Sequence, residues 1–401
     1  MKKKVKFKTY PELLNNLNNH GLNVSGEEIS IEILKTRGYY NLVNRYKNDL
    51  YRKNINEFNT RTTIENLYHF HRMEDDLRNI LFRFTLTFEQ FLKESMSYTL
   101  ASTWGVDPKK YLNPNNYSYR HQKRAISILN MILEIQNTSK NPTKYYKDNY
   151  DVIPPWILLN NAMFGQTKAL FKILPIDLKR YIIHQMMPFD FFNYHFDKYH
   201  SKQISEEMTN RLFDEGDLIA RSLAKTTHKE IDIEEWLDYI DPFVYKDFKG
   251  TPYLNKVSKQ IDDERIEAFS GVLDAIHEFR NTLAHGSRIV HFHFKKNLRL
   301  NLITKYTGAN FNVTQFKKEN LGNGVFGVLL GLLITLDKFD TLLLISKLKS
   351  WKKDVTKTFN DKKDYDLFIK SCGLPKNFIY ILDNIRKDLY STNKRYYESK
   401  Y

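Results

Sequence analysis

Hydrophobic positions recur at helical spacing through most of the chain. Beginning at Leu77, large apolar side chains return every three or four residues as far as Leu92. This spacing places them on one face of an amphipathic helix. Threonines at 62–63 suit a helix N-cap, and Gly105 lies where the pattern ends. We therefore predict a long helix over residues 62–102.

The same periodicity predicts three shorter helices between loops rich in asparagine and proline, at residues 120–136, 156–174 and 325–344. The most apolar stretch, residues 325–336, is about half as long as a membrane span and continues into charged residues. We therefore expect a buried helix there and no membrane contact. Because helical spacing dominates the chain, the expected fold class is all-α.

One segment departs from helical spacing. Two alternating runs, residues 289–294 and 298–303, flank a short polar segment, which is typical of a small β-hairpin inserted in a helical core. His291 and His293 share one face of the first run. Since no third ligand follows at a suitable spacing, we predict a polar hairpin face and no metal site.

Charge narrows the choice of partner. The 401 residues include 62 Lys and Arg and 47 Asp and Glu, giving a formal net charge of +15. Such an excess indicates a polyanionic partner, most often nucleic acid. The single cysteine, Cys372, excludes an internal disulfide and a cysteine-based zinc site, as expected in the reducing cytoplasm. The common cofactor and hydrolase motifs are absent, so we predict no cofactor.

Composition divides the chain into three predicted parts. These are a basic and aromatic segment at residues 1–60, a helical core at 61–345 and a basic helical segment at 346–401. Residues 230–241 of the core are acidic within basic surroundings. They form either a solvated helix face or a strip that repels RNA from the wrong surface or shields the site until a partner arrives.

The clearest candidate chemistry lies in residues 269–286. Five apolar residues share one helical stripe that a core would bury: Phe269, Val272, Ile276, Phe279 and Leu283. The other side carries His277, Asn281 and His285, with Arg280 at its margin. Gly286 follows where glycines end helices. We therefore predict a helix that presents an arginine, an amide and histidines on its polar face.

An arginine, an amide and a histidine on one face suit metal-free cleavage of RNA. The 2′-hydroxyl of the RNA can attack the adjacent phosphorus, so the protein needs only a proton carrier and a cation. His285 would transfer protons near neutral pH. Arg280 would hold the phosphate as negative charge develops, and Asn281 would orient His285 or a phosphate oxygen. The same residues also fit a polar helix face that ends on a capping histidine.

Two further regions are candidate RNA-binding surfaces. Arg45 and Tyr46 lie among alternating aromatic and basic residues, which suit stacking on unpaired bases and contact with phosphates, although tyrosine-rich helix packing explains them equally. Four lysines near the C-terminus form the second candidate, a phosphate-contacting surface: Lys347, Lys349, Lys352 and Lys353.

Several motifs carry a family resemblance. Residues 280–285, Arg-Asn-Thr-Leu-Ala-His, resemble the R-N-x-x-A-H form of the Rx4–6H motif of HEPN ribonucleases. Most of the chain resembles the Abi-like abortive-infection proteins of the AbiD/AbiF branch. The matching elements are the Gly-Tyr-Tyr stretch in 35–46, the helix at 67–101, the Pro-Pro-Trp to Phe-Gly element at 154–165 and the Gly-Leu-Pro stretch at 372–375.

This resemblance implies an all-α HEPN-type bundle and a metal-independent endoribonuclease of bacterial antiphage defence, associated with a structured noncoding RNA. It assigns the catalytic roles to Arg280, Asn281 and His285. Residues five apart on a helix diverge by about 140°, and the earlier Arg78-Asn79 pair has no matching histidine. We therefore expect a homodimer in which two copies complete the site.

Two other functions remain open from the residues alone. The chain could be a catalytically inert module that grips a noncoding RNA, in which case lysine changes would matter and His285 would not. It could also be an interaction protein whose 26 tyrosines and 27 phenylalanines serve the core and protein contacts.

Overall fold

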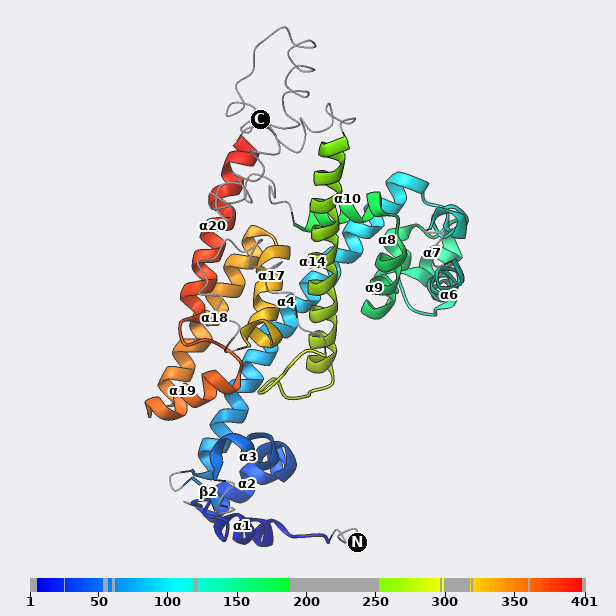
Figure 1. Ribbon diagram of the computed structural model, residues 1–401. Coiled ribbons are helices and arrows are strands. Elements are labelled where there is room, and N and C mark those ends of the chain that lie inside the picture. The colour runs from blue at the N-terminus through cyan, green and yellow to red at the C-terminus, as the bar shows by residue number, and fades with distance from the viewer. Residues whose placement is uncertain are drawn as a thin grey trace, which may run out of the picture.

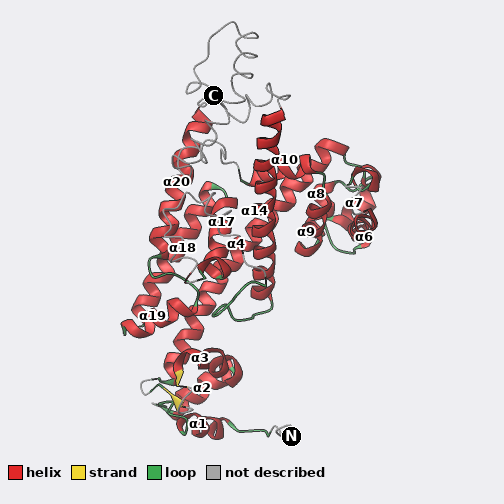
Figure 2. Cartoon of the chain, viewed as in Figure 1, coloured by secondary structure: helices red, strands yellow, loops and turns green. Residues whose placement is uncertain are grey.

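The computed structural model describes residues 6–24, 26–52, 57–59, 62–117, 122–187, 252–295, 298, 318, 320–359 and 361–398. Helices dominate this part of the chain (Figure 2), which confirms the predicted all-α fold. The strands described are β1 (Tyr51–Arg52) and β2 (Glu57–Phe58), which pair antiparallel with Tyr51 opposite Phe58.

The long helix α4 (Ile64–Trp104) is the spine of the molecule (Figure 1). It begins where Thr63 accepts a hydrogen bond from the Asn66 N–H at 3.1 Å, and it ends at Gly105, whose φ is +86°. Its predicted apolar face is buried, including Leu77, Phe84 and Phe88. The sequence prediction of this helix is confirmed, because capping and burial agree with the periodicity.

A small N-terminal unit covers the beginning of α4. It consists of α1 (Tyr10–Asn18), α2 (Glu27–Arg37), the π-helix η1 (Tyr40–Asn44), α3 (Arg45–Leu50) and the two strands. Its aliphatic residues and the buried Tyr46 join the same hydrophobic core as α4. This unit therefore packs against the spine through apolar contacts.

A side lobe, residues 108–173, extends from the other end of α4 (Figure 1). It contains α5 (Pro108–Tyr111), η2 (Pro114–Asn116), α6 (Gln122–Leu133), η4 (Glu134–Asn137), α7 (Thr143–Asn149), α8 (Pro155–Leu158), η5 (Leu159–Asn161) and α9 (Phe164–Ile173). The single helix predicted at 156–174 is wrong, because Met163 is extended and Gln166 accepts its N–H at 2.7 Å to begin α9.

The remaining helices complete the bundle. They are α10 (Ile176–Met186), α14 (Pro252–Ala284), η8 (Leu321–Asn323), α17 (Val325–Thr335), α18 (Lys338–Thr358), α19 (Lys362–Ser371) and α20 (Phe378–Glu398). Every residue of α17 is buried, as predicted. None of the helices in the described ranges combines the length and apolarity needed to span a membrane.

The predicted helix at 325–344 is two helices. Leu336 adopts extended backbone with ψ of 153°, and Asp337 then accepts N–H bonds from Phe339 at 2.7 Å and Asp340 at 2.8 Å. This capping begins α18 in a new direction. The boundary expected at residue 345 falls inside α18, which is continuous from Lys338 to Thr358.

The predicted hairpin is wrong in the portion that the structure describes. Residues 289–295 are turn and loop, and His291 has a φ of +56°. The Ile289 and Val290 N–H groups donate to the Glu74 carboxylate rather than to a partner strand. Of the second run, only Leu298 lies within the described residues. The acidic stretch 230–241 lies outside them.

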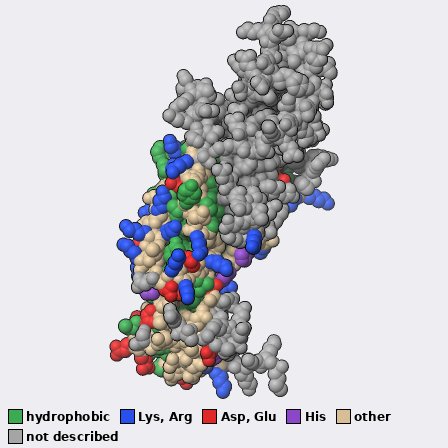
Figure 3. All heavy atoms as spheres, turned by 60° about the vertical axis from the view of Figure 1, so that its left-hand side comes forward, with side chains coloured by type: hydrophobic (Ala, Val, Ile, Leu, Met, Phe, Trp, Pro, Cys, Tyr) green, Lys and Arg blue, Asp and Glu red, His purple; other side chains and the backbone are tan. Residues whose placement is uncertain are grey.

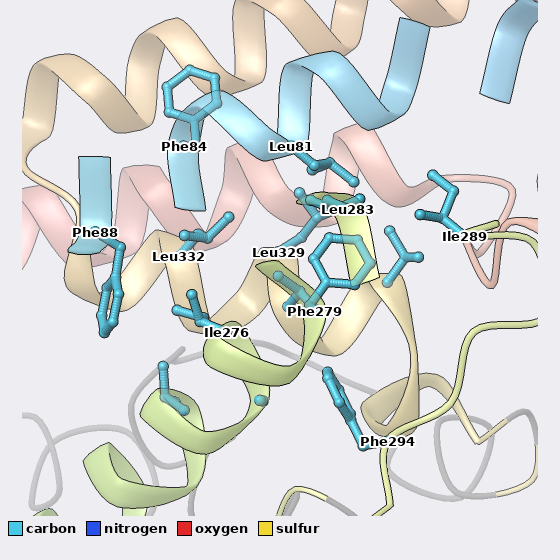
Figure 4. Close-up of a cluster of buried hydrophobic side chains, with 14 of the residues drawn as sticks. Leu81, Phe84, Phe88, Ile276, Phe279, Leu283, Ile289, Phe294, Leu329 and Leu332 are labelled. Atoms are coloured by element: carbon cyan, nitrogen blue, oxygen red, sulfur yellow. The ribbon is translucent and has the colours of Figure 1, made fainter. Parts of the chain in front are cut away.

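The apolar stripe of α14 packs as predicted. Figure 4 shows Ile276, Phe279 and Leu283 among Leu81, Phe84 and Phe88 of α4 and Leu329 and Leu332 of α17. These side chains are all buried, with at most 5% of their surface exposed. Because this stripe is fixed in the core, the polar residues of α14 are turned toward its margins with α4 and α9.

Candidate functional site: the polar face of α14

The polar helix ends as its sequence predicts. Gly286 has a φ of +64° and donates its N–H to the Leu283 carbonyl at 3.0 Å, while the Ser287 N–H bonds to the Thr282 carbonyl at 3.1 Å. These two bonds form a Schellman cap, which needs a left-handed residue at this glycine. His285 is therefore the C-cap residue, and it is exposed.

Arg280 is held in place by the spine. Its Nε lies 3.2 Å from Oε2 of Glu89 on α4, and Oε1 of Glu89 lies 3.0 Å from Lys93 Nζ. The Glu89 side chain is 9% exposed, whereas that of Arg280 is 27% exposed. The carboxylate therefore fixes a guanidinium that still reaches the surface.

A row of polar contacts continues from Arg280 along α14 to α9. Arg280 Nη1 lies 3.5 Å from Asn281 Oδ1, and Asn281 Nδ2 lies 3.3 Å from His277 Nε2. Nδ1 of His277 lies 3.0 Å from Lys168 Nζ. At the far end, Asp274 holds the ammonium groups of Lys168 at 3.2 Å and Lys172 at 2.8 Å.

Hydrogen-bond donors outnumber acceptors in this row. With Asn281 Oδ1 facing Arg280, the Asn281 amide N–H points at one ring nitrogen of His277, and the Lys168 ammonium points at the other. A neutral imidazole accepts at one nitrogen only. The row is therefore rich in hydrogen-bond donors, and such an arrangement favours a bound anion.

The environment of His277 keeps its ring neutral. Burial lowers the pKa of His277 to about 4, and the positive charge of Lys168 contributes in the same direction. A perturbed histidine within a charged cluster is typical of functional sites. Sequence analysis placed His277 on the polar face without a role, because its contact with Lys168 joins residues 109 positions apart.

We expect His277 to make folding stability depend on pH. The unfolded chain binds a proton near the ordinary pKa of 6.5, whereas the folded protein binds it only near 4. Stability should therefore fall as pH decreases from about 6.5 to 4. Urea denaturation at pH 7 and pH 5 should show a smaller loss for His277→Gln than for the native protein. An identical loss in both would contradict this assignment.

The structure brings Arg280, Asn281 and His277 together, but it does not bring His285 to them. No hydrogen bond or ion pair between Arg280 and His285 occurs among the described residues. Arg280 turns toward α4, and His285 lies at the exposed end of the helix. This placement agrees with the divergence expected for residues five apart.

A buried carboxylate anchors the loop that follows His285. Glu74 of α4 is fully buried and accepts N–H bonds from Ile289 at 2.5 Å and Val290 at 3.2 Å. It also accepts the Tyr46 hydroxyl at 2.5 Å and lies 3.6 Å from Arg45 Nη1. Arg45 Nη2 donates to the Gly286 carbonyl at 3.1 Å. The N-terminal unit and α4 thus hold the end of the polar helix.

The prediction that Arg45 and Tyr46 contact RNA is wrong. Arg45 is 8% exposed and Tyr46 is not exposed at all, so neither can stack on a base or reach a phosphate. Burial raises the pKa of Tyr46 well above its usual value, and the Glu74 carboxylate adds to this effect. Both residues support the loop at Gly286 instead.

The four C-terminal lysines lie on α18. Lys347, Lys349 and Lys353 are exposed, and Lys349 lies 3.4 Å from Asp383. Lys352 is half-buried, with its ammonium 5.7 Å from the centre of the Phe378 ring. Figure 3 shows basic side chains spread over this face of the molecule together with acidic ones. Contact of these lysines with RNA stays a prediction.

The described part of the chain contains no group of three His, Cys, Asp or Glu side chains that could hold a metal ion. The fold and the site define a mainly helical protein in which α14 packs one face into the core and presents a basic, donor-rich face at its margin. Residues 32–291 match the model of the family described as Abi-like protein. The match covers more than half of the chain, so the chain belongs to the Abi-like protein family.

This membership agrees with the resemblance seen in the sequence and suggests a role in abortive-infection defence. The matched region ends at His291, so it includes the polar helix, the first part of the loop after it and the contacts with Glu74. No curated protein and no solved structure matches the chain.

Proposed function

We propose that the protein is a metal-independent endoribonuclease of the HEPN type that acts in abortive-infection defence. It cuts RNA by attack of the 2′-hydroxyl, leaving a 2′,3′-cyclic phosphate and a 5′-hydroxyl. The observation that carries this proposal is the guanidinium of Arg280, fixed by Glu89 beside Asn281 and His277 within the region of the family match.

The charge of the polar face supports an anionic ligand. Four cations, Lys93, Lys168, Lys172 and Arg280, face two carboxylates, Glu89 and Asp274. The donor groups of Arg280, Asn281 and Lys168 suit acceptor oxygens, which a phosphodiester supplies. An arginine fork binds two such oxygens at once, and a guanidinium held before the reaction needs little reorganisation as charge develops.

The roles follow from the side chains. Arg280 binds the phosphate and stabilises the charge of the transition state. His285 accepts the proton of the attacking 2′-hydroxyl as a base or donates a proton to the leaving 5′-oxygen as an acid. Asn281, between Arg280 and His277, orients a phosphate oxygen. The lysines of α18 bind RNA away from the cleavage site, and a structured noncoding RNA is a partner in the cytoplasm.

The chemistry of the product ends tests this function. We expect purified protein to cut RNA in the presence of EDTA and to leave 2′,3′-cyclic phosphate ends, which resist ligation until a phosphatase removes them. A 2′-deoxy nucleotide at the cut position should prevent cleavage, because it removes the nucleophile. Cleavage of the deoxy substrate, or loss of activity with EDTA, would contradict the mechanism.

Separation of Arg280 from His285 within one chain supports a site shared by two copies. Mixing the Arg280→Ala and His285→Ala proteins should then restore activity. Two-fold symmetry gives each dimer two Arg280–His285 pairs, each with one residue from either copy. Half of the dimers in an equal mixture are mixed, and one of the two pairs in a mixed dimer is native. We expect about a quarter of native activity from this symmetry. Absence of restored activity after verified subunit exchange would exclude a shared site.

A catalytically inert RNA-binding protein is the second candidate, and the distance of His285 from the polar row favours it. In this case phage defence would survive His285→Ala and would be lost with the basic surface, in a salt-dependent manner. Measurement of defence and RNA cleavage with the same variants separates the two functions.

A further inference from the structure

The side lobe carries an exposed cluster of tyrosines at α7. Tyr145 and Tyr150 are 52% and 54% exposed, and Tyr146 lies beneath them, packed against the core. The Tyr146 and Tyr150 rings stack with centroids 4.6 Å apart. The Tyr145 ring lies 6.2 Å from each of the other two, edge to face. Three rings thus form one ordered aromatic surface with two members facing solvent.

Positive charge is concentrated in the same lobe. Residues 108–173 include ten Lys and Arg and three Asp and Glu, so they carry +7 of the net charge of +15. Lys140, Lys144 and Lys147 beside the tyrosines are exposed. Asp148 pairs with Lys144, and Lys147 Nζ donates to Asn137 Oδ1 at 3.3 Å. The other two carboxylates of the lobe, Glu134 and Asp151, are also exposed, and Glu134 accepts from Asn137 Nδ2 at 3.2 Å.

We propose that the tyrosine cluster of residues 145, 146 and 150 binds single-stranded RNA. Tyr145 and Tyr150 stack on unpaired bases, and Lys140, Lys144 and Lys147 contact the phosphates. Aromatic stacking combined with a basic surface is how proteins bind single strands without reading their sequence. In a duplex the base faces are already stacked, so the cluster selects unpaired nucleotides. An acidic protein surface would be attracted to the same lysines, but only a nucleic acid supplies bases for the rings together with phosphates for the cations.

This site deepens the proposed function and rests on it for the choice of RNA as the nucleic acid. The side lobe also contains α9, whose Lys168 contacts His277 on the polar face of α14. One lobe therefore carries both the tyrosine cluster and a cation of the candidate cleavage site. An RNA strand bound at the tyrosines is therefore held by the same lobe that contacts the polar face of α14.

Fluorescence anisotropy of the full chain with a labelled 2′-O-methyl oligouridine of roughly a dozen nucleotides tests this inference, because this probe cannot be cut. The double variant Tyr145→Ala with Tyr150→Ala should bind it about tenfold or more weakly. The double Phe variant should bind like the native protein, since it keeps the rings. Tyr380→Ala, at a tyrosine that is 68% exposed on α20, is the matched control and should not change affinity.

Tyr146 stays in every variant because it packs against the core, and thermal unfolding checks that each variant folds. Native affinity of the double Ala variant, or equal weakening in the Phe variant, would overturn the proposal. A change in the mass of the protein in solution, with RNA affinity unchanged, would assign the tyrosines to a protein contact instead. The probe cannot be cut, so this experiment measures binding independently of cleavage. Weaker binding by the double Ala variant would support the tyrosine site even if the protein has no nuclease activity. Native affinity of that variant would leave the proposed nuclease activity unaffected.

Discussion

Replacement of Arg280 with alanine should reduce RNA cleavage by about 100- to 1,000-fold or more, the usual effect of removing a group that stabilises transition-state charge. Arg280→Lys should recover little of this activity, because an ammonium cannot bind two phosphate oxygens in a fork. RNA affinity should change much less, since the basic side lobe and α18 remain. A gel-based cleavage assay and anisotropy with uncleavable RNA measure the two effects separately.

The structure offers controls for this variant. Glu89 keeps Lys93 at 3.0 Å when Arg280 is removed, so the buried carboxylate retains a cation and the protein should stay folded. Arg83→Ala is the matched control on α4. Its guanidinium lies 5.7 Å from the Phe84 ring centre, outside the polar row. Native cleavage by Arg280→Ala, or equal loss in Arg83→Ala, would show that the guanidinium of Arg280 has no part in the reaction.

Replacement of Glu74 with alanine should lower the free energy of unfolding by about 3–5 kcal/mol, the typical cost of removing one partner of a buried ion pair. The change leaves the Arg45 charge and the N–H groups of Ile289 and Val290 without their acceptor in the interior. Urea denaturation followed by circular dichroism measures the loss.

Glu94→Ala provides the comparison for Glu74. Glu94 lies on the same helix, but it is exposed and bonds only to the Gln90 side chain among the interactions described. We expect a change within about 0.5 kcal/mol for this variant. Glu74→Gln should fall between the two, because its amide oxygen keeps one acceptor. If Glu74→Ala were as stable as Glu94→Ala, the buried cluster would not hold the loop.

Local sequence rules predicted the parts of the fold that depend on local physics. The periodicity from Leu77 identified α4, and the glycine at 286 identified the end of α14, because burial and capping act within a few residues. Asp337 is a readable N-cap signal after an apolar run, yet hydrophobicity alone extended the predicted helix through it. The N-cap signal at Asp337 was therefore present in the sequence, but the prediction gave more weight to the hydrophobic run.

Other errors come from contacts between distant residues. The alternation in 289–294 is typical of a strand, but the backbone donors there bind Glu74, some 215 positions earlier in the chain. Arg45 and Tyr46 have the composition of a surface that stacks on bases, but both are buried, and both bind the same distant carboxylate. The link from His277 to Lys168 was likewise invisible, since no local pattern joins two helices.

The two glutamates of α4 also constrain the spacing of this helix. Glu74 holds the loop after α14, and Glu89 holds Arg280 in the last turns of α14. The two residues are fifteen positions apart, which is roughly 22 Å along the axis of a helix. One inserted residue between them would rotate one carboxylate by about 100° relative to the other. The two carboxylates could then not both reach their partners, so this stretch of α4 should tolerate substitutions at its exposed positions but not a change in length.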